Sequence, residues 1–366
     1  MKIKANGVVF LIIVIAIIVL LTARKPVSTG STGTNVVVQN RSGNPMENEG
    51  SNPAAKEIAS PSGFINSQNF TIQGLIGRKV VLVDFWAYSC INCQREIPYL
   101  NAWYSKYAGS GLEIVGVHTP EFAFETERKN VEDAVQKFGI RYPVVMDNAY
   151  GTWNAYGNQY WPMIYLIDIN GYIVYEHAGE GNYQETELEL QKLLAARNSA
   201  LNGTATIPSG TIMPQTYTPG DSVSPETYFG SNRNSLLAEG VPFKSGPQTL
   251  QKPANPGAGL LYLGGGWDIE AEYAQSVFDA SITYKFHAAK AYIVADSSNP
   301  ANVSILLDGK PLLANRGTDV SIGTNGSYAT ISKPGLYGIF DSQSAGDHVL
   351  ELDFPPQVRA YTFTFG

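Results

Sequence analysis

Cysteine is scarce in this sequence, and its scarcity limits the chemistry open to the chain. The 366 residues include two cysteines, Cys90 and Cys93, and four histidines without the spacing of paired metal ligands. A structural zinc site needs about four ligands, which this pair alone does not supply. Covalent haem attachment requires a histidine directly after the second cysteine, where this chain has Gln94. We therefore expect no metal, no haem and no cofactor beyond a redox-active disulfide between Cys90 and Cys93.

Basic charge is also in short supply. The chain has 25 Lys and Arg against 32 Asp and Glu, which gives a formal net charge of −7 at pH 7. Nucleic acids bind to basic surfaces, so this balance argues against a nucleic acid partner. No pair of carboxylates stands out as a hydrolase site. Hydrophobic residues nevertheless make up 44% of the chain, enough for sizeable cores, and the length predicts two domains joined by linkers.

The two cysteines lie between a predicted strand, residues 80–86, and a predicted helix, residues 94–107. Free N–H groups and the dipole at a helix start stabilise a thiolate on the first cysteine. The second cysteine follows one helical turn later, near enough to close a short disulfide. Such a pair can cycle between dithiol and disulfide, which is redox chemistry. A purely structural disulfide is the alternative, although so short a loop constrains the unfolded chain little.

Residues 83–93, with the sequence VDFWAYSCINC, resemble the active-site strand, turn and helix start of the thioredoxin superfamily. Pro98 resembles the proline that bends the family's active-site helix, and Trp161-Pro162 resembles its cis-proline loop. The serine before Cys90 and the Ile-Asn between the cysteines depart from thioredoxin itself. The TlpA-type domain of DipZ-family proteins is more similar, and the residues that carry this likeness are 86–93, 117–122, 160–162 and 179–181.

The resemblance implies roles for four residues in thiol–disulfide exchange. Cys90 would be the attacking thiolate, and Cys93 would be the resolving thiol. Asp84 would accept the proton of Cys93, acting through water. Pro162 would shape the edge along which an extended substrate pairs.

Substrate-binding candidates are Tyr88, Trp161, His118 and Glu121. His118 and Glu121 end a strand, a common place for site residues in open α/β sheets, although a turn held by Thr119-Pro120 explains them equally well. The aromatic side chains would offer apolar area to a peptide, although packing in the core explains them nearly as well.

The first 25 residues predict a membrane anchor. Residues 8–21 are apolar, and with their neighbours they just reach the roughly 17 residues that span a bilayer. A cleavage site needs small residues that are poorly represented here, so we favour an uncleaved anchor over a cleaved signal peptide. No cysteine follows to carry a lipid. Together with the disulfide chemistry, this predicts a single-pass protein of a bacterial cell membrane, with its domains on the extracytoplasmic side.

Composition divides the rest of the chain into four parts. Residues 26–60 are polar and rich in Ser, Thr, Gly and Pro, which predicts a flexible tether. Residues 61–197 alternate strand and helix patterns, as in a thioredoxin-like α/β domain with an insertion after its second strand. Residues 198–225 form a second predicted linker. The elements expected in the α/β domain are strands at 112–117, 143–146, 163–168 and 172–176 and helices at 125–138 and 183–197.

Residues 226–366 change to a period-two pattern with many short strands, which predicts an all-β sandwich of jelly-roll type. Asp308-Gly309 is a strong hairpin signal. DipZ proteins carry a C-terminal β-domain that resembles a carbohydrate-binding module. Trp267, with Tyr262 and Tyr273, could therefore form an aromatic platform for a glycan, although a sandwich core needs such residues too.

Together these features predict an anchored, extracytoplasmic thiol–disulfide oxidoreductase that acts on protein dithiols and disulfides. The TlpA-type resemblance favours reduction or isomerisation of disulfides in exported proteins. DipZ proteins often carry a multi-helix electron-transfer domain for which this chain has no room, so we expect a separate membrane electron donor. The direction of the reaction stays open, because Ile-Asn does not reveal the redox poise. The alternative is a cell-surface glycan-binding or adhesion protein whose cysteine pair is not catalytic.

Overall fold

A computed structural model of the chain describes residues 52–204, 206–212 and 223–366, which fall within one compact unit, residues 40–366. The predicted membrane anchor, residues 1–25, lies outside the described residues, as does most of the predicted tether. Within the described ranges, no helix has the length and apolar character needed to cross a bilayer.

The first half of the described chain is built on a six-stranded mixed sheet with the order β1-β4-β3-β2-β5-β6. β2 (Val80–Trp86) lies in the middle, parallel to β3 (Leu112–His118) and antiparallel to β5 (Met163–Ile167). All seven residues of β2 are buried, as expected for a near-continuous apolar run in a sheet covered on both faces. The other strands are β1 (Gly63–Ile65), β4 (Val144–Met146) and β6 (Ile173–Ala178).

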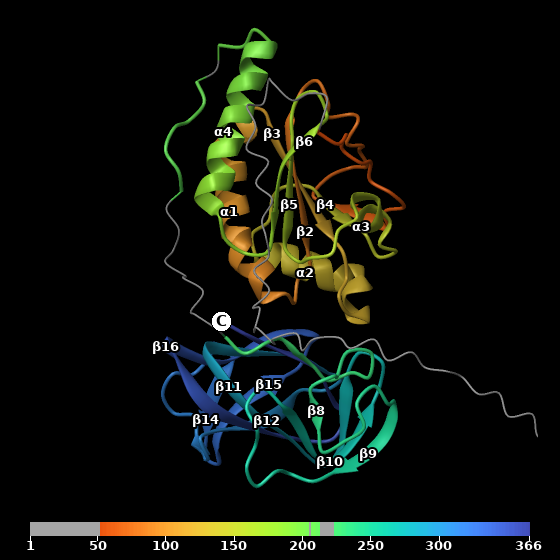
Figure 1. Ribbon diagram of the computed structural model, residues 1–366, viewed down its shortest axis with the longest axis vertical. Coiled ribbons are helices and arrows are strands. Elements are labelled where there is room, and N and C mark those ends of the chain that lie inside the picture. The colour runs from red at the N-terminus through yellow and green to blue at the C-terminus, as the bar shows by residue number, and fades with distance from the viewer. Residues whose placement is uncertain (1–51, 205, 213–222) are drawn as a thin grey trace, which may run out of the picture. The chain divides into compact units, whose positions relative to one another are not determined.

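Helices cover this sheet and complete the predicted thioredoxin-like α/β fold (Figure 1). Val80 and Leu82 of β2 pack with α1, α2 and α4 in one core cluster. Val81 and Val83 point the other way and pack with Trp153 of α3 in a second cluster. The helices are α1 (Ile91–Tyr107), α2 (Arg128–Lys137), α3 (Gly151–Tyr156) and α4 (Tyr183–Ala200), with two 3-10 turns, η1 (Ala108–Ser110) and η2 (Ala123–Thr126).

Several elements differ from the sequence-based expectation. α1 begins at Ile91, three residues before the predicted start, because Cys90 is its N-cap. The single helix predicted for residues 125–138 is divided at Glu127 into η2 and α2, since Glu127 has an extended backbone. α3 was not predicted: six residues give too short a periodic pattern to read from sequence.

The end of the predicted tether and part of the second predicted linker both pack against the α/β region. Ala54 forms a β-bridge with Tyr172, and the carboxylate of Glu57 accepts the backbone N–H groups of Ile72 and Gln73. After α4, the N–H of Ile212 donates to Glu187 at 2.6 Å. These residues therefore belong to the folded region.

The C-terminal half is all-β, as predicted. Its 11-stranded network has the main order β14-β15-β12-β16-β11-β10-β8, while β17 pairs with β11 and β7, β13 with β12, and β9 with β10. The strands are β7 (Thr227–Tyr228), β8 (Leu237–Ala238), β9 (Gly246–Leu250), β10 (Leu261–Ile269), β11 (Ala274–Ser297), β12 (Ala301–Leu307), β13 (Lys310–Pro311), β14 (Val320–Gly323), β15 (Gly326–Ile331), β16 (Gly335–Phe354) and β17 (Val358–Phe365).

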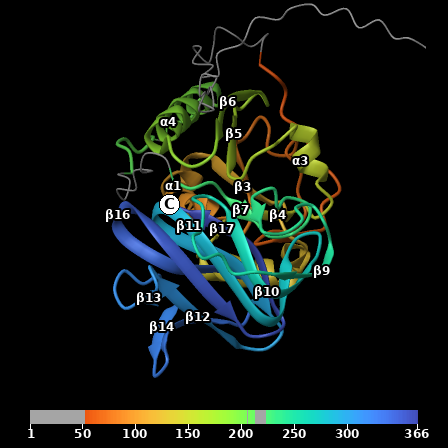
Figure 2. The ribbon, with the colours of Figure 1, turned by 60° about the horizontal axis from the view of Figure 1, so that its bottom comes forward.

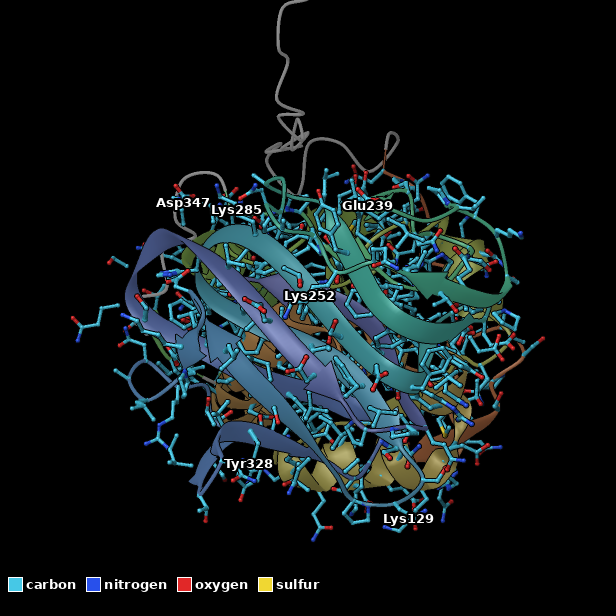
Figure 3. All side chains as sticks on the ribbon, turned by 90° about the horizontal axis from the view of Figure 1, so that it is seen from below. Lys129, Glu239, Lys252, Lys285, Tyr328 and Asp347 are labelled. Carbon is cyan, nitrogen blue, oxygen red and sulfur yellow. The ribbon has the colours of Figure 1, made fainter. Side chains whose placement is uncertain are left out.

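Two long strands, β11 and β16, form the centre of this β-domain (Figure 2). They pair antiparallel, with register shifts between Ala288 and Lys290 and between Ala291 and Tyr292, where bulges let so long a ribbon bend around one core. The predicted turn at Asp308-Gly309 joins β12 to β13, and both residues have the positive φ that such a hairpin turn requires. On the outer face, Lys252 pairs with Glu351 (Figure 3). The jelly-roll arrangement itself stays a prediction.

Candidate active site

Cys90 and Cys93 lie at the start of α1, at the carboxyl end of β2. Cys90 is the N-cap residue of the helix and is partly exposed, whereas Cys93 is 1% exposed. Both are free thiols, and the backbone N–H of Cys93 donates to Cys90 Sγ at 3.2 Å. The N–H donor and the helix N-terminus both direct positive partial charge toward Cys90 Sγ. The geometry thus gives the pair one accessible sulfur and one hidden sulfur.

The hidden thiol is held in its protonated form. Burial, followed by the hydrogen bond and charge of Cys90, raises the pKa of Cys93 well above its usual value. A thiol must lose its proton before it can attack a disulfide. Cys93 therefore needs a nearby base in order to react.

Two buried carboxyl groups lie beneath the cysteines. Asp84 of β2 and Glu96 of α1 are each 1% exposed and lie near enough for each to shift the pKa of the other. Burial raises the pKa of Asp84 to about 7, and the neighbouring Glu96 carboxyl partly offsets this rise. Burial and the charge of Asp84 raise the pKa of Glu96 well above its usual range. Glu96 therefore keeps its proton, and Asp84 is the member of the pair that can ionise near neutral pH.

His118, predicted as a substrate contact, lies under the active-site turn and is fully buried. Its Nε2 accepts the backbone N–H of Tyr88 at 3.3 Å, so the ring proton is on Nδ1. The ring stacks on Tyr88 and meets Trp86 edge to face at 4.9 Å. Burial lowers the pKa of His118 to about 3, so the imidazole is neutral. In this position it supports the turn and has no surface to offer a substrate.

The turn before Cys90 is also held by Glu125, a fully buried residue of η2. Its Oε1 accepts the backbone N–H of Ser89 at 3.0 Å and the Ser89 hydroxyl at 2.8 Å. Its Oε2 accepts the backbone N–H groups of Glu121 at 2.6 Å and Phe122 at 3.2 Å. Burial, followed by the charge of Glu121, raises the pKa of Glu125 to about 7. One carboxylate thus joins Ser89 to the turn at residues 121–122.

Glu121, also predicted as a substrate contact, faces the β-domain. Its Oε1 accepts hydrogen bonds from Arg233 at 2.8 Å and from the Tyr228 hydroxyl at 2.9 Å. Phe122 beside it is buried against Tyr361 of β17, with ring centroids 5.1 Å apart. These contacts leave the Glu121 side chain 9% exposed, so it is committed to the two halves of the chain rather than to a ligand.

The loop expected to carry a cis proline has that form, since the Trp161-Pro162 peptide bond is cis. Pro162 is buried at the start of β5, and its carbonyl accepts the N–H of Gly179 at 2.9 Å. Trp161 is half-buried and packs on Trp153 at 4.2 Å between centroids. Of the aromatic residues near this edge, Tyr160 is 48% exposed and is the one most open to solvent.

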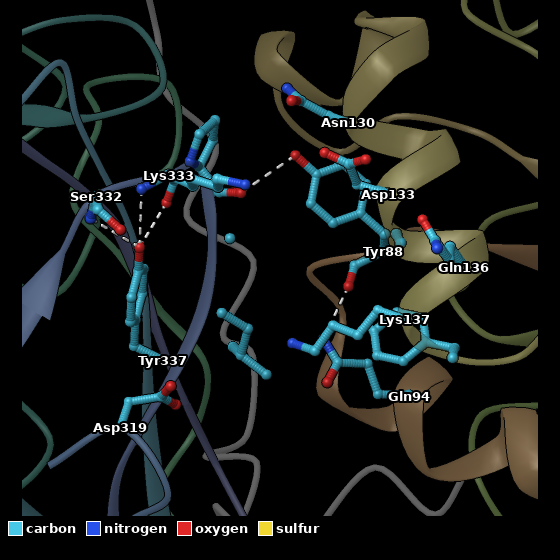
Figure 4. A pocket seen from close by; sticks show the side chains of 15 residues that line it. Tyr88, Gln94, Asn130, Asp133, Gln136, Lys137, Asp319, Ser332, Lys333 and Tyr337 are labelled. Atoms are coloured by element: carbon cyan, nitrogen blue, oxygen red, sulfur yellow. Dashed lines mark hydrogen bonds between the residues drawn. The ribbon is translucent and has the colours of Figure 1, made fainter.

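A cavity of about 530 Å³ lies beside the active-site turn (Figure 4). Tyr88 and Gln94, which flank the cysteine pair in the sequence, line one side, and the Gln94 amide donates to the Tyr88 carbonyl at 2.8 Å. α2 lines a second side. Residues 332–337 of the β-domain line the third, and the Tyr88 hydroxyl lies 3.4 Å from the carbonyl of Pro334.

The aromatic platform predicted in the β-domain does not form. Trp267 is 1% exposed, packs on Phe354, and donates its indole N–H to the Gly264 carbonyl. Tyr262 is 7% exposed. The prediction is wrong because these aromatic residues fill the core, which was the other reading of the same pattern.

Sequence reasoning missed Glu96 and Glu125. Glu96 follows Cys93 by three residues on one helix, so its position below the cysteines could have been read from helical spacing. Glu125 comes 35 positions after Cys90, and nothing local in the sequence links it to Ser89. Its contact with Ser89 forms because β3 and η2 bring Glu125 back to the active-site turn in the folded chain.

Two families match this chain. Residues 51–196 match the Redoxin family, and residues 224–366 match the family described as thioredoxin-like C-terminal domain. Protein DipZ of Mycobacterium tuberculosis is 40% identical to this chain over 271 residues. The matched region makes up 73% of this chain and 38% of the length of DipZ. The thiol-disulfide oxidoreductase ResA of Bacillus thuringiensis is 31% identical over a region that makes up 34% of this chain and 75% of the length of ResA. A solved thiol:disulfide interchange protein of Chlorobium tepidum is 24% identical, covers 39% of this chain and 97% of its own, and has a TM-score of 0.34.

Proposed function

The chain belongs to the thioredoxin-like family of thiol–disulfide oxidoreductases, and on that premise we propose that it reduces or isomerises disulfides in exported proteins through Cys90 and Cys93. We further propose that residues 61–197 perform this chemistry, that residues 198–225 link them to the β-domain at 226–366, and that residues 1–25 anchor the chain in a bacterial cell membrane. The substrate is then a polypeptide on the extracytoplasmic side, and a separate membrane protein supplies the electrons.

The proposed reaction has two exchange steps. The Cys90 thiolate attacks one sulfur of a substrate disulfide, which forms a mixed disulfide and releases the other substrate sulfur as a thiolate. Cys93 passes its proton to Asp84, attacks Cys90 Sγ, and releases the second substrate thiolate. The substrate gains two electrons, and the enzyme ends as the Cys90–Cys93 disulfide. A dithiol donor then restores the reduced pair.

One observation carries this proposal: a thiol that is 1% exposed lies one helical turn behind an accessible N-cap cysteine and above a carboxyl group whose pKa is about 7. A purely structural cysteine pair has no use for an ionisable acid in the core, which costs stability when it is charged. The same acid is useful where a buried thiol has to lose a proton.

Turnover with a polypeptide disulfide tests the proposal. Full-length protein should speed the reduction of insulin by dithiothreitol, and Cys90→Ser should abolish that effect while keeping the fold. A folded wild-type protein that gives no acceleration would remove the oxidoreductase proposal. No specific observation in the described residues favours the glycan-binding alternative, since Trp267 and Tyr262 of the predicted sugar platform are buried.

A further inference from the structure

The segment that holds the turn before Cys90 also contacts the β-domain. We infer that Glu125 is a positioning residue for Cys90, and that residues 119–126, here called the coupling loop, transmit β-domain docking to the active site. This inference rests on the proposed chemistry of Cys90 and assigns a role to the β-domain in it.

Glu125 carries four hydrogen bonds on a carboxylate with no exposure to water. Two of them fix both the backbone and the hydroxyl of Ser89, the residue directly before the N-cap cysteine. A buried charge accepting four donors is a stiff connection, because releasing any donor leaves it unpaired in a dry environment. Movement of the coupling loop is therefore passed to the backbone of Cys90.

The coupling loop is also bound to the β-domain, through three of its residues. Glu121 accepts hydrogen bonds from Tyr228 and Arg233. The N–H of Ala123 donates to the Glu272 carboxylate at 2.8 Å. Phe122 packs in a cluster with Tyr361. The loop is thus clamped between Ser89 and the β-domain, and the position of Cys90 depends on both.

The variant Glu125→Gln distinguishes a positioning role from a purely electrostatic influence and from a purely scaffolding role. An amide presents one acceptor and one donor, so whichever way it is turned, at least one backbone N–H faces another donor and the link fails. We expect Glu125→Gln to slow the attack of Cys90 on a small disulfide probe about tenfold at pH 8. A purely electrostatic influence predicts the reverse, since removing a nearby negative charge favours the thiolate. A purely scaffolding role predicts a lower melting temperature with an unchanged rate.

Tyr228→Phe tests the path from the β-domain with a smaller change. It removes one hydroxyl, which lies between the carboxylates of Glu121 and Glu226, and keeps the ring that Arg233 covers. We expect the attack rate of the full chain to fall about twofold to threefold, in line with one lost hydrogen bond to a charged group. The matched control is Tyr328→Phe. Tyr328 lies on β15 of the same domain, and this strand pairs with β12 and β14. This control should leave the rate unchanged.

The double variant decides whether the two effects share one path. If the β-domain acts on Cys90 through Glu125, Tyr228→Phe should have no further effect on the rate in a Glu125→Gln background. Additive effects would overturn the path, and an unchanged or faster rate in Glu125→Gln would overturn the positioning role. If Glu125→Gln fails to fold, Tyr228→Phe with an unchanged rate would overturn the inference by itself. Absence of probe reduction by the wild type would instead count against the proposed function.

Discussion

Asp84 and Glu96 are neighbouring buried carboxyl groups, of which Asp84 is the one that ionises near neutral pH. Burial and the charge of Asp84 raise the pKa of Glu96 well above its usual value, so Glu96 keeps its proton and Asp84 is the base. Both Glu96 oxygens and Asp84 Oδ1 are buried without a hydrogen-bond partner among the described residues. Asp84 can therefore act as a base close to Cys93 without placing two charges in the core.

The first prediction concerns the resolving step. Asp84→Asn keeps the shape of the side chain and removes the base, so release of a mixed disulfide by Cys93 should slow about a hundredfold near pH 7. The defect should shrink as pH rises, since hydroxide can then take the thiol proton. Stopped-flow release of a fluorescent thiol from Cys90 measures this step. An unmoved pH–rate profile would rule out the catalytic role of Asp84.

The second prediction concerns stability and follows from the same raised pKa. Because the native state binds the Asp84 proton more tightly than the unfolded state does, the stability contributed by this group is greatest at low pH and falls between pH 3.8 and about 7. Asp84→Asn removes that fall. The variant should be more stable than the wild type at pH 8, by at most about 4 kcal/mol, and the difference should vanish in acid.

Urea unfolding at pH 5 and pH 8 measures this difference, which should be less than half as large at pH 5 as at pH 8. Glu113→Gln is a matched control, because Glu113 is a partly buried carboxyl of β3 that pairs with Lys79 instead of lying under the cysteines. It should not change the resolving step. If Asp84→Asn destabilises the protein at pH 8, the carboxyl is a structural hydrogen-bonding group.

The third prediction assigns the two thiols their order. In Cys93→Ser, Cys90 can still attack, but nothing inside the protein resolves the product, so mixed disulfides with substrate proteins should accumulate. Cys90→Ser should trap little, because Cys93 is 1% exposed. Mass spectrometry after acid quenching counts the adducts. Comparable trapping by both variants would contradict the order.

The fourth prediction concerns the cavity beside Tyr88. Lys137 and Lys333 line it and form no ion pair within the described parts of the chain, while its two acids are engaged, Asp133 with Lys129 and Asp319 with the Thr318 hydroxyl and the Gly338 N–H. Disulfide peptides with acidic residues around the cysteine should therefore be reduced about fivefold faster, in kcat/KM, than peptides with basic ones at low salt. The preference should disappear in Lys137→Met/Lys333→Met.

Lys310→Met is the control for this preference, since Lys310 is an exposed lysine of β13 outside the cavity. It should leave the ratio of the two peptides as it is in the wild type. Equal reduction of both peptides by the wild type would show that the cavity does not select substrates, although the chemistry at Cys90 would stand.

The parts of the site that sequence could predict are those with a local signature. Cys90, Cys93 and Asp84 lie on one strand–turn–helix unit, and their spacing fixes their geometry. Contacts that depend on the return of distant segments, such as that of Glu125 with Ser89, have no such signature. Trp267 shows the same limit from the other side, because a period-two pattern does not tell whether an aromatic residue fills a core or lines a surface.

The neutral state of His118 has a consequence for how activity depends on temperature. Imidazole is the side chain that usually titrates between about pH 5 and pH 8, but this one keeps its lone pair for Tyr88 down to about pH 3. Of the carboxyls next to the active-site turn and the cysteine pair, Asp84 and Glu125 are the two whose pKa burial raises to about 7. A carboxyl ionises with little heat, whereas an imidazolium absorbs a good deal. The midpoint of the activity profile should accordingly stay nearly fixed as the protein is warmed, where a histidine-controlled enzyme would drift toward acid.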